Sequence, residues 1–378
     1  MKTTVWTMER GLNVSVAERK RRDAEDAEAR RGFATLRILR VSALKFGRCA
    51  FITALLLSVM LVTSSVKAAE QAVSNDVDRA VERGFDFLRK QQKEDGSFHH
   101  NVAVSGLSAM AFLARGYVPG SGPDGERVER ALANIIAEQS EDGSILGRGG
   151  RMYGHGICSL LLAEAAGMSA NERVTAALRK ACDLILRAQA EPKSPQHTGG
   201  WRYEPRSRDS DISVTGWQLL ALRAAKDCGV KIPGEAIESA VGFVKRCAAR
   251  EGGFAYQPGG GAGHARTGCG MVSLQMCGQY DAPEVKRGAD WLRTHEMKWG
   301  REHFYYAIYY VTQAMYQRGG DDWAWWHPLL EKMLFEHQTG DGSWPTTGGE
   351  GEGGPVYATA MSLLALCVQY HYLPAYQR

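Results

Sequence analysis

The sequence predicts an all-α protein folded as an α/α toroid (an α6/α6 barrel) of six helical hairpins. The first observation is a Gly-centred turn that occurs six times, with marker glycines at positions 96, 143, 200, 253, 300 and 342. The second is the spacing of 47, 57, 53, 47 and 42 residues between them, which leaves room for two helices and two loops. A hairpin cannot bury both faces alone, so neighbouring hairpins must stack, either in a closed ring or in an open superhelix.

The first helix of each hairpin is expected to lie on the outside. Its apolar residues recur at i, i+3, i+4 and i+7 and leave charged residues on the opposite face, which is typical of a helix with one side in solvent. In the first four hairpins these stripes cover residues 77–88, 128–135, 174–181 and 237–244.

The second helix of each hairpin is apolar nearly all round and rich in Gly, Ala and Ser, which is typical of a helix buried on every side. These segments cover residues 104–114, 157–166, 213–225, 270–277, 304–315 and 356–368. The contrast predicts two concentric layers. Six inner helices at ordinary interaxial distances leave a central hollow, and we expect a ligand there.

Residues 1–68 are predicted to be a charged leader followed by a secretory signal peptide, and residues 69–378 a single toroid domain. The run 50–63 is apolar and uncharged, follows Lys45 and Arg48, and precedes small residues that end at Ala68. It is shorter than the roughly 20 residues of a membrane-spanning helix. We therefore expect an exported protein, periplasmic or secreted, with an uncleaved N-terminal membrane anchor as the alternative.

The charge balance excludes a nucleic-acid partner. Of the 46 Lys and Arg and the 42 Asp and Glu, 13 and 6 lie in residues 1–68, which leaves 33 basic and 36 acidic residues in the rest of the chain. No basic run remains there to neutralise phosphates. The seven cysteines outside the leader are an odd number without a Cys-x-x-Cys pair, so neither a disulfide framework nor a structural zinc site is expected.

Several of the turns, together with Asp211–Leu222, resemble the repeats of the terpenoid cyclase and protein prenyltransferase superfamily. The turns in question read Gly-Ser-Trp or Gly-Gly-Trp after a helix that ends near Gln, and the similarity covers roughly residues 76–370. In squalene-type cyclases of this superfamily a buried carboxylic acid protonates an alkene. The resemblance places Asp211 on that acid and Asp209 on its first partner, while Ile212 replaces a second carboxylate. The other interpretation of Asp211 is a helix N-cap, and the two roles can coexist.

The prenyltransferase branch implies a catalytic zinc held by Asp, Cys and His. Here Ser213 stands where that branch has Cys. No metal and no cofactor are therefore predicted, and Asp211, His264 and Cys269 remain weak candidates for a metal site.

Aromatic residues cluster near the expected starts of the inner helices, where a cyclase would use ring faces to stabilise carbocations. The predicted substrate-binding residues are Trp217, Tyr305, Tyr309, His155, Tyr357 and Tyr203. For His155 a buried, hydrogen-bonded structural role is the alternative. Trp201, Phe254 and Trp344 recur at one place in their repeats and are expected to join neighbouring hairpins.

The Gly-rich segments 259–263 and 348–354 precede two inner helices and are expected to form a rim where a hydrophobic small molecule or a protein partner enters. The function predicted first is an exported cyclase-like toroid with a cavity for an isoprenoid-like ligand and acid-catalysed cyclisation through Asp211. The alternative is a non-catalytic toroid that binds a lipid or a protein. Peripheral membrane association is compatible with both, and the sequence leaves open whether the protein is an enzyme.

Overall fold

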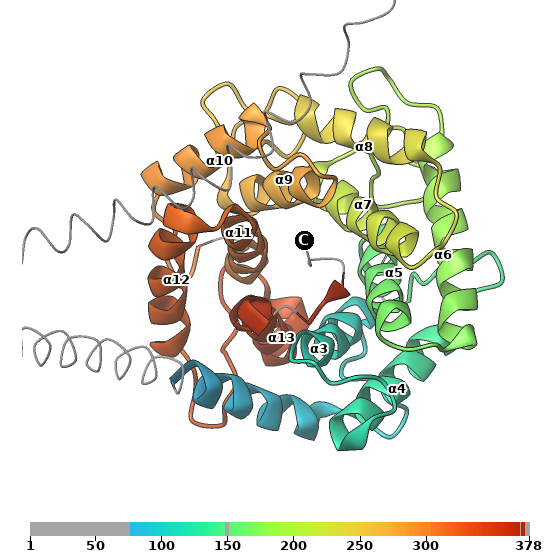
Figure 1. Ribbon diagram of the computed structural model, residues 1–378, viewed down its shortest axis with the longest axis vertical. Helices are drawn as coiled ribbons and strands as arrows, with labels where there is room; N and C mark the ends of the chain where they lie inside the picture. The colour runs from blue at the N-terminus through green and yellow to red at the C-terminus, as the bar shows by residue number, and fades with distance from the viewer. Residues whose placement is uncertain (1–75, 148–150, 302, 371, 375–378) are drawn as a thin grey trace, which may run out of the picture. The chain divides into compact units, whose positions relative to one another are not determined.

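The computed structural model describes residues 76–147, 151–301, 303–370 and 372–374 (Figure 1). The predicted leader, the signal peptide and the domain boundary after residue 68 lie outside these residues. The described part of the chain is all-α, with isolated β-bridges in place of strands. Within it, none of the helices has the length and apolarity needed to cross a bilayer.

The helices form two concentric rings, as Figure 1 shows. The inner ring consists of α3 (Val102–Ala114), α5 (Arg151–Met168), α7 (Ile212–Asp227), α9 (His264–Met276), α11 (Phe304–Arg318) and α13 (Gly354–Leu366). The outer ring consists of helical residues 76–91, α4 (Gly122–Ala137), α6 (Glu172–Ala190), α8 (Gly234–Arg246), α10 (Pro283–Thr294) and α12 (Gly320–Phe335). Two short 3₁₀ helices, η2 (Gly351–Gly353) and η3 (Cys367–Tyr370), flank α13.

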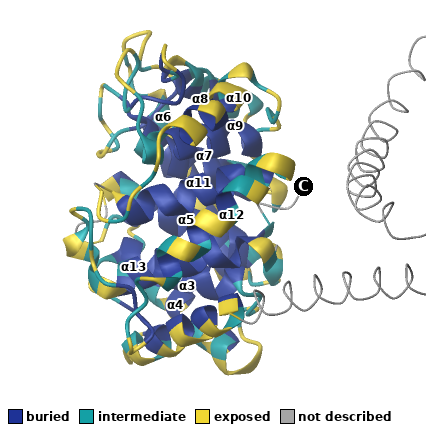
Figure 2. Ribbon diagram, turned by 90° about the vertical axis from the view of Figure 1, so that its left-hand side faces the viewer, coloured by how far each residue is buried: buried dark blue, intermediate teal, exposed yellow. Residues whose placement is uncertain are grey.

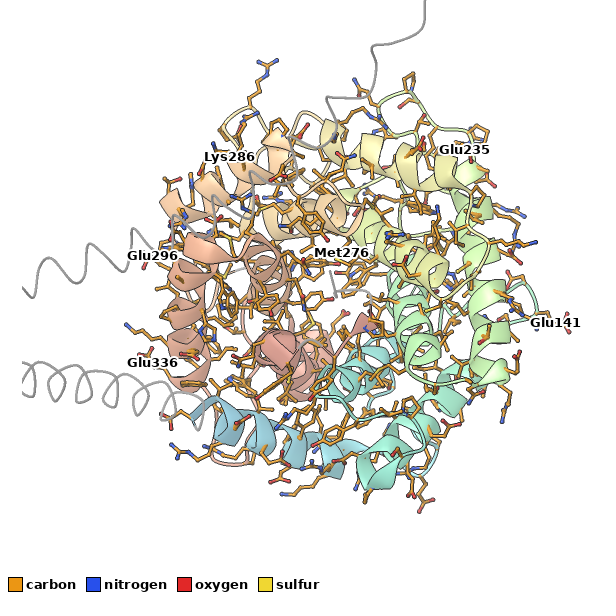
Figure 3. All side chains as sticks on the ribbon, viewed as in Figure 1. Glu141, Glu235, Met276, Lys286, Glu296 and Glu336 are labelled. Carbon is orange, nitrogen blue, oxygen red and sulfur yellow. The ribbon has the colours of Figure 1, made fainter. Side chains whose placement is uncertain are left out.

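Each inner helix packs against the next, and α13 packs against α3, so the ring closes. This arrangement confirms the predicted α/α toroid of six hairpins and excludes the open superhelix. All residues of α3 are buried, whereas α4, α6, α8 and α10 bury only one stripe (Figure 2). Charged side chains of the outer layer, such as Glu235, Lys286 and Glu336, point away from the ring (Figure 3). The small and apolar side chains of the inner helices thus explain why these helices form the inner ring.

A glutamine at the end of an outer helix joins each of four hairpins to the next. The Nε2 group of Gln139 donates to the carbonyl oxygen of Gly143 in its own turn (3.1 Å) and to that of Ala177 in α6 (2.9 Å). Gln92 and Gln189 make the same pair of bonds at their joints. Gln338 repeats the pattern across the closure of the ring.

The closing joint links the last hairpin to the first. Gln338 Nε2 donates to the carbonyl oxygens of Gly342 (2.9 Å) and Ala80 (2.8 Å). Gly342 has a φ of 90°, and a Cβ atom there would lie 2.2 Å from the carbonyl oxygen of Arg83. Only glycine fits this left-handed position so close to a helix backbone. The same pair of glutamine hydrogen bonds joins the last hairpin to the first and joins the internal hairpins. The repeats themselves therefore specify the ring.

The C-terminal segment crosses the end of the ring where the inner helices terminate. Arg115, the C-cap of α3, lies over the ring of Tyr370, with 4.4 Å from Cζ to the ring centroid. The ring of Tyr372 packs against Gly116, and Pro374 packs against Gly167 near the end of α5. The opposite end, where the inner helices begin, holds a pocket.

Candidate functional site

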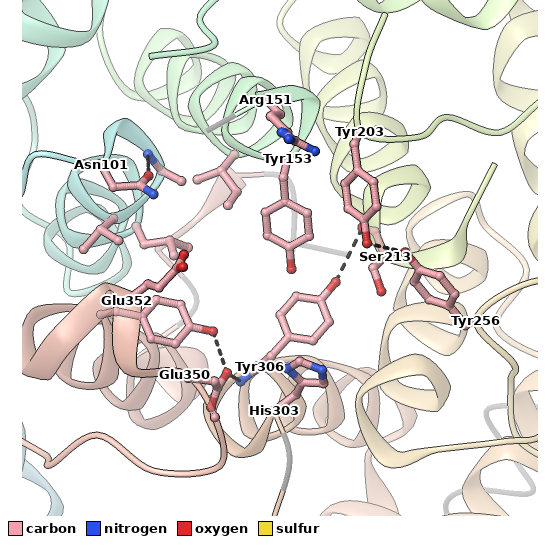
Figure 4. Close-up of a pocket in the computed structure, with 17 residues that line it drawn as sticks. Asn101, Arg151, Tyr153, Tyr203, Ser213, Tyr256, His303, Tyr306, Glu350 and Glu352 are labelled. Carbon is pink, nitrogen blue, oxygen red and sulfur yellow. Dashed lines mark hydrogen bonds between the residues drawn. The ribbon is translucent and has the colours of Figure 1, made fainter. Parts of the chain in front are cut away.

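A pocket of about 470 Å³ opens at the end of the toroid where the inner helices begin (Figure 4). The first residues of five inner helices, or the residues just before them, form its mouth: Asn101, Arg151, Ser213, His303 and Gly353. A pocket of this size is in the range that small-molecule sites occupy. The ring architecture therefore creates one hollow to which several elements contribute side chains.

The walls of the pocket differ in chemistry. One wall is aliphatic and comes from α3 and α5: Ala103, Val104, Leu107 and Ile157. Five of the other lining residues are tyrosines, and Figure 4 shows the hydroxyls of Tyr153 and Tyr306 pointing toward one another. The remaining phenols are those of Tyr203, Tyr256 and Tyr357.

The phenol groups are hydrogen-bonded to their surroundings. The Tyr306 hydroxyl donates to the carbonyl oxygen of Ser213 (3.4 Å), and the hydroxyls of Tyr203 and Tyr256 bond to each other. Burial raises the pKa of Tyr153 and of Tyr306 above the ordinary range of a tyrosine. These phenols therefore stay protonated at physiological pH and act as neutral hydrogen-bonding groups.

Glu350 holds the start of α11 from a distance in sequence. The N-cap of that helix, His303, is left-handed (φ 55°) and makes no side-chain cap bond. Glu350 Oε2 accepts from the Tyr305 N–H (2.8 Å) and Oε1 accepts from the Tyr306 N–H (3.1 Å).

The same Oε1 atom of Glu350 accepts from the Tyr357 hydroxyl (2.9 Å). Burial raises the pKa of the Glu350 carboxyl, while the helix N–H groups and the phenol oppose that rise. This carboxylate was missed in the sequence; its one signal is an acid inside the Gly-rich segment 348–354.

Asp211 is the N-cap of α7, which confirms the capping interpretation. Its Oδ1 accepts from the Val214 N–H (2.9 Å), and the side chain is fully buried. Burial raises the pKa of the carboxyl to about 6, against the opposing effects of the Val214 N–H and the Arg202 charge. The carboxyl does not line the pocket: its neighbours Ser213 and Tyr256 do. Asp211 thus lies behind the pocket wall.

Arg202 lies between the two aspartates of the predicted motif. Its Nη1 is 3.2 Å from Asp209 Oδ2, and its Nε is 3.6 Å from Asp211 Oδ2. Asp209 is half-exposed and also accepts from Gln257 Nε2 at 3.2 Å. The guanidinium lies near the rings of both Tyr203 and Tyr256. The positive charge of Arg202 lowers the pKa of the Asp211 carboxyl, against the effect of burial.

Of the predicted binding residues, Tyr203 and Tyr357 line the pocket. Trp217 and Tyr309 are fully buried and stack on each other, with ring centroids 5.4 Å apart, so they form packing beside the pocket rather than its wall. Tyr305 is also turned away from the pocket, since its hydroxyl donates to the carbonyl oxygen of Pro345 (2.5 Å). The aromatic run at the start of α11 places Tyr306 in the pocket instead.

His155 has the buried, hydrogen-bonded structural role that is the alternative to ligand binding. Its Nδ1 accepts from the Ile145 N–H (3.1 Å), and its Nε2 lies 3.1 Å from the carbonyl oxygen of Ala181. These contacts fix the neutral tautomer with the proton on Nε2, and burial lowers the pKa to about 4. His155 joins the turn before α5 to helix α6 and does not reach the pocket.

The candidates for a metal site each have other partners. Asp211 caps α7, the Cys269 thiol donates to the carbonyl oxygen of Ile212 (3.3 Å), and His264 Nε2 lies 2.7 Å from the carbonyl oxygen of His295. Among the described residues, no group of three His, Cys, Asp or Glu side chains is placed to hold a metal ion. The three candidates are therefore not brought together.

Only one of the two Gly-rich segments reaches the pocket. Gly349, Glu350, Glu352 and Gly353 of the segment 348–354 line its mouth. The segment 259–263 is held away from it, with the Ala262 N–H donating to Glu251 Oε1 (2.9 Å).

Comparison with known proteins places the fold. Residues 155–304 match the prenyltransferase alpha-alpha toroid domain. No curated protein matches the chain in sequence. A substrate complex of a type II terpene cyclase from Scytonema has a TM-score of 0.50 and 14% identity, and covers 80% of this chain and 98% of that one. These findings confirm the resemblance to the terpenoid cyclase and prenyltransferase toroids.

Toroids of other activities have somewhat higher TM-scores. Cellobiose 2-epimerase from Spirochaeta thermophila has a TM-score of 0.59 and 15% identity, and covers 79% of this chain and 96% of that one. An inactive variant of an α-1,6-mannanase from Salegentibacter, in complex with α-1,6-mannotetrose, has a TM-score of 0.58 and 10% identity, with coverages of 79% and 98%. At such identities the likeness shows the fold, and the activity has to be argued from the site.

Proposed function

We propose that this chain is a ligand-binding toroid that holds an uncharged small molecule in the pocket at the start of its inner helices. The observation that carries the proposal is the lining of that pocket, which combines aliphatic side chains with several protonated phenols. Binding sites for small molecules combine apolar walls with a few convergent polar groups in this way. A non-catalytic binding toroid was the alternative interpretation of the sequence, and the position of Asp211 supports it over a cyclase.

Acid-catalysed cyclisation requires a carboxylic acid in contact with the substrate. Here Asp211 is fully buried behind Tyr256 and Ser213, and it is engaged by the Val214 N–H. An alkene in the pocket would therefore meet phenols and not the Asp211 carboxyl, and the Glu350 carboxylate at the mouth is already engaged by the N–H groups of Tyr305 and Tyr306. Asp211 stabilises the start of α7, and α7 supports the pocket wall.

The proposal is tested by filling the pocket. Val104, on the aliphatic wall, is replaced by Trp; the control is Val118→Trp, because Val118 is exposed and lies away from the pocket. Native mass spectrometry of the full chain after purification from its source is expected to show a small molecule on the wild type and on Val118→Trp but not on Val104→Trp. Equal occupancy of all three proteins, or none on any, contradicts the proposal.

Acid catalysis by Asp211 is the second candidate, and one observation favours it. The carboxyl has a pKa of about 6 and lies one side chain behind the pocket, beside Tyr256. Wild type and Asp211→Asn are incubated with squalene and with shorter polyprenes. Turnover by the wild type that Asp211→Asn abolishes would establish the cyclase; no turnover by either supports the binding function.

We also propose export, on the basis of the apolar run 50–63 and the small residues that end at Ala68. N-terminal sequencing of the protein from its source is expected to begin at Ala69, and a start at Met1 would contradict cleavage. The ligand, or a protein partner, would enter at the rim formed by the segment 348–354. The same rim is where a peripheral contact with a membrane would deliver a lipid.

A further inference from the structure

The phenols that line the pocket offer more hydrogen-bond acceptors than donors. A phenol oxygen has one O–H donor and two acceptor lone pairs. The Tyr306 hydroxyl donates to the Ser213 carbonyl oxygen, and the Tyr357 hydroxyl donates to Glu350. Of the two O–H groups of Tyr203 and Tyr256, one donates to the other residue's oxygen. The hydroxyls of Tyr153 and Tyr306 also bond to each other, and the lone pairs that all these bonds leave remain for a ligand. A molecule that satisfies them carries several O–H or N–H groups.

The ligand is also uncharged. Five inner helices begin at the mouth of the pocket, and the partial positive charge of helix N-termini disfavours an ammonium group. An anion would meet the Glu350 carboxylate, which is already satisfied by the N–H groups of Tyr305 and Tyr306. Arg151, whose side chain is 63% exposed, pairs with Glu204 at 3.3 Å, so its charge is also partnered. Glu352 also lines the mouth, but it is exposed, so solvent screens its charge. A buried ion would therefore find no buried opposite charge that lacks a partner.

The remaining feature is the aliphatic part of the lining, formed by Val104, Leu107 and Ile157. A donor-rich, neutral molecule with one apolar face fits this arrangement, and a pyranose ring has such a face of C–H groups and an edge of hydroxyls. An isoprenoid alcohol has a single hydroxyl and would leave most of the phenol oxygens buried without a donor, which costs free energy.

We propose that the pocket binds a neutral sugar ring, either a free hexopyranose or the terminal unit of an oligosaccharide. This inference rests on the proposed binding function and names its ligand class. The phenols of Tyr153 and Tyr306 bind the hydroxyl edge, and Leu107 and Ile157 contact the C–H face.

Isothermal titration calorimetry of the full chain tests this. The probes are glucose, mannose, galactose and cellobiose as neutral sugars, glucosamine and glucuronate as charged ones, and geranylgeraniol in detergent micelles as the isoprenoid. The variants Tyr153→Phe and Tyr306→Phe remove one hydroxyl each and keep the ring. Tyr117→Phe is the matched control, because that phenol bonds to Arg89 and packs against Phe85 away from the pocket.

At least one neutral sugar is expected to bind, about 3- to 10-fold more weakly to Tyr153→Phe and to Tyr306→Phe, as the loss of one hydrogen bond implies. Tyr117→Phe is expected to bind like the wild type. Sugar binding that is equally tight in the wild type, Tyr153→Phe and Tyr306→Phe overturns the assignment. Tighter binding of glucosamine or glucuronate than of any neutral sugar overturns it too. If geranylgeraniol binds and no sugar does, and Tyr306→Phe binds it more weakly than the wild type, the sugar assignment is overturned but the binding function is supported. No binding of any probe overturns both.

Discussion

Replacing Gln338 by Ala tests whether the ring is closed by the same bonds that join its internal repeats. The Nε2 group of Gln338 donates to Gly342 at 2.9 Å and, across the closure, to Ala80 at 2.8 Å. The matched variant is Gln139→Ala, which removes bonds of 3.1 and 2.9 Å at an internal joint. The two side chains are half-buried in equivalent surroundings.

The magnitude follows from the two bonds lost at each joint. A net contribution of about 0.5 to 1.5 kcal/mol per hydrogen bond predicts a loss of about 1 to 3 kcal/mol in the free energy of unfolding for either variant. In an open array, Ala80 would be far from Gln338, and only the local bond to Gly342 would be lost.

Urea unfolding followed by far-ultraviolet circular dichroism gives both values. We expect the two variants to lose stability equally within about 0.5 kcal/mol, the usual scatter between independent sites. A loss at Gln139 more than twice that at Gln338 would refute the closed ring.

Two further predictions concern pH. The Asp211 carboxyl has a folded pKa of about 6 against 3.8 unfolded, so the folded state holds its proton longer and stability falls as pH rises between these values. Asp211→Asn keeps an N-cap acceptor; its stability relative to wild type is expected to rise by about 3 kcal/mol from pH 3.8 to 6, and a flat difference would contradict the buried carboxyl. His155 has a folded pKa of about 4 against 6.5, so the unfolded state binds its proton first. The stability of wild type relative to His155→Gln is expected to fall by about 3 kcal/mol as pH drops from 6.5 to 4, measured by the same unfolding titrations; a constant difference would show a histidine in water.

The two rings could be predicted from the sequence because the two helix classes differ in composition. An outer helix such as α6 shows an apolar stripe, and an inner helix such as α3 shows none, which fixes the layer to which each belongs. The capping role of Asp211 was also predictable, since an N-cap depends on a few neighbouring residues.

The lining of the pocket could not be predicted, because the uniform apolar composition that identifies an inner helix does not show how that helix is rotated. A helix that is apolar all round has no stripe to show which side faces the central hollow. In α11 the run of aromatics offers Tyr305, Tyr306 and Tyr309, and a rotation of one residue, about 100°, decides which of them enters the pocket. Packing against α9 and α13 sets that rotation.

Glu350 was missed because its role depends on a contact between segments far apart in sequence. It caps α11 from the loop before α13, 45 residues after Tyr305. No local pattern marks such a partner. The left-handed His303, which lacks a cap bond of its own, becomes visible only with the backbone in hand.

A crystal structure of the full chain grown with cellobiose or with the sugar that binds best is the most direct test of the central claim, that the closed ring holds a neutral ligand at the start of its inner helices. The predicted result is a sugar ring between Leu107 and Ile157 on one side and the hydroxyls of Tyr153 and Tyr306 on the other. A sugar bound only outside the ring, or a hollow filled by the chain's own side chains, would contradict it.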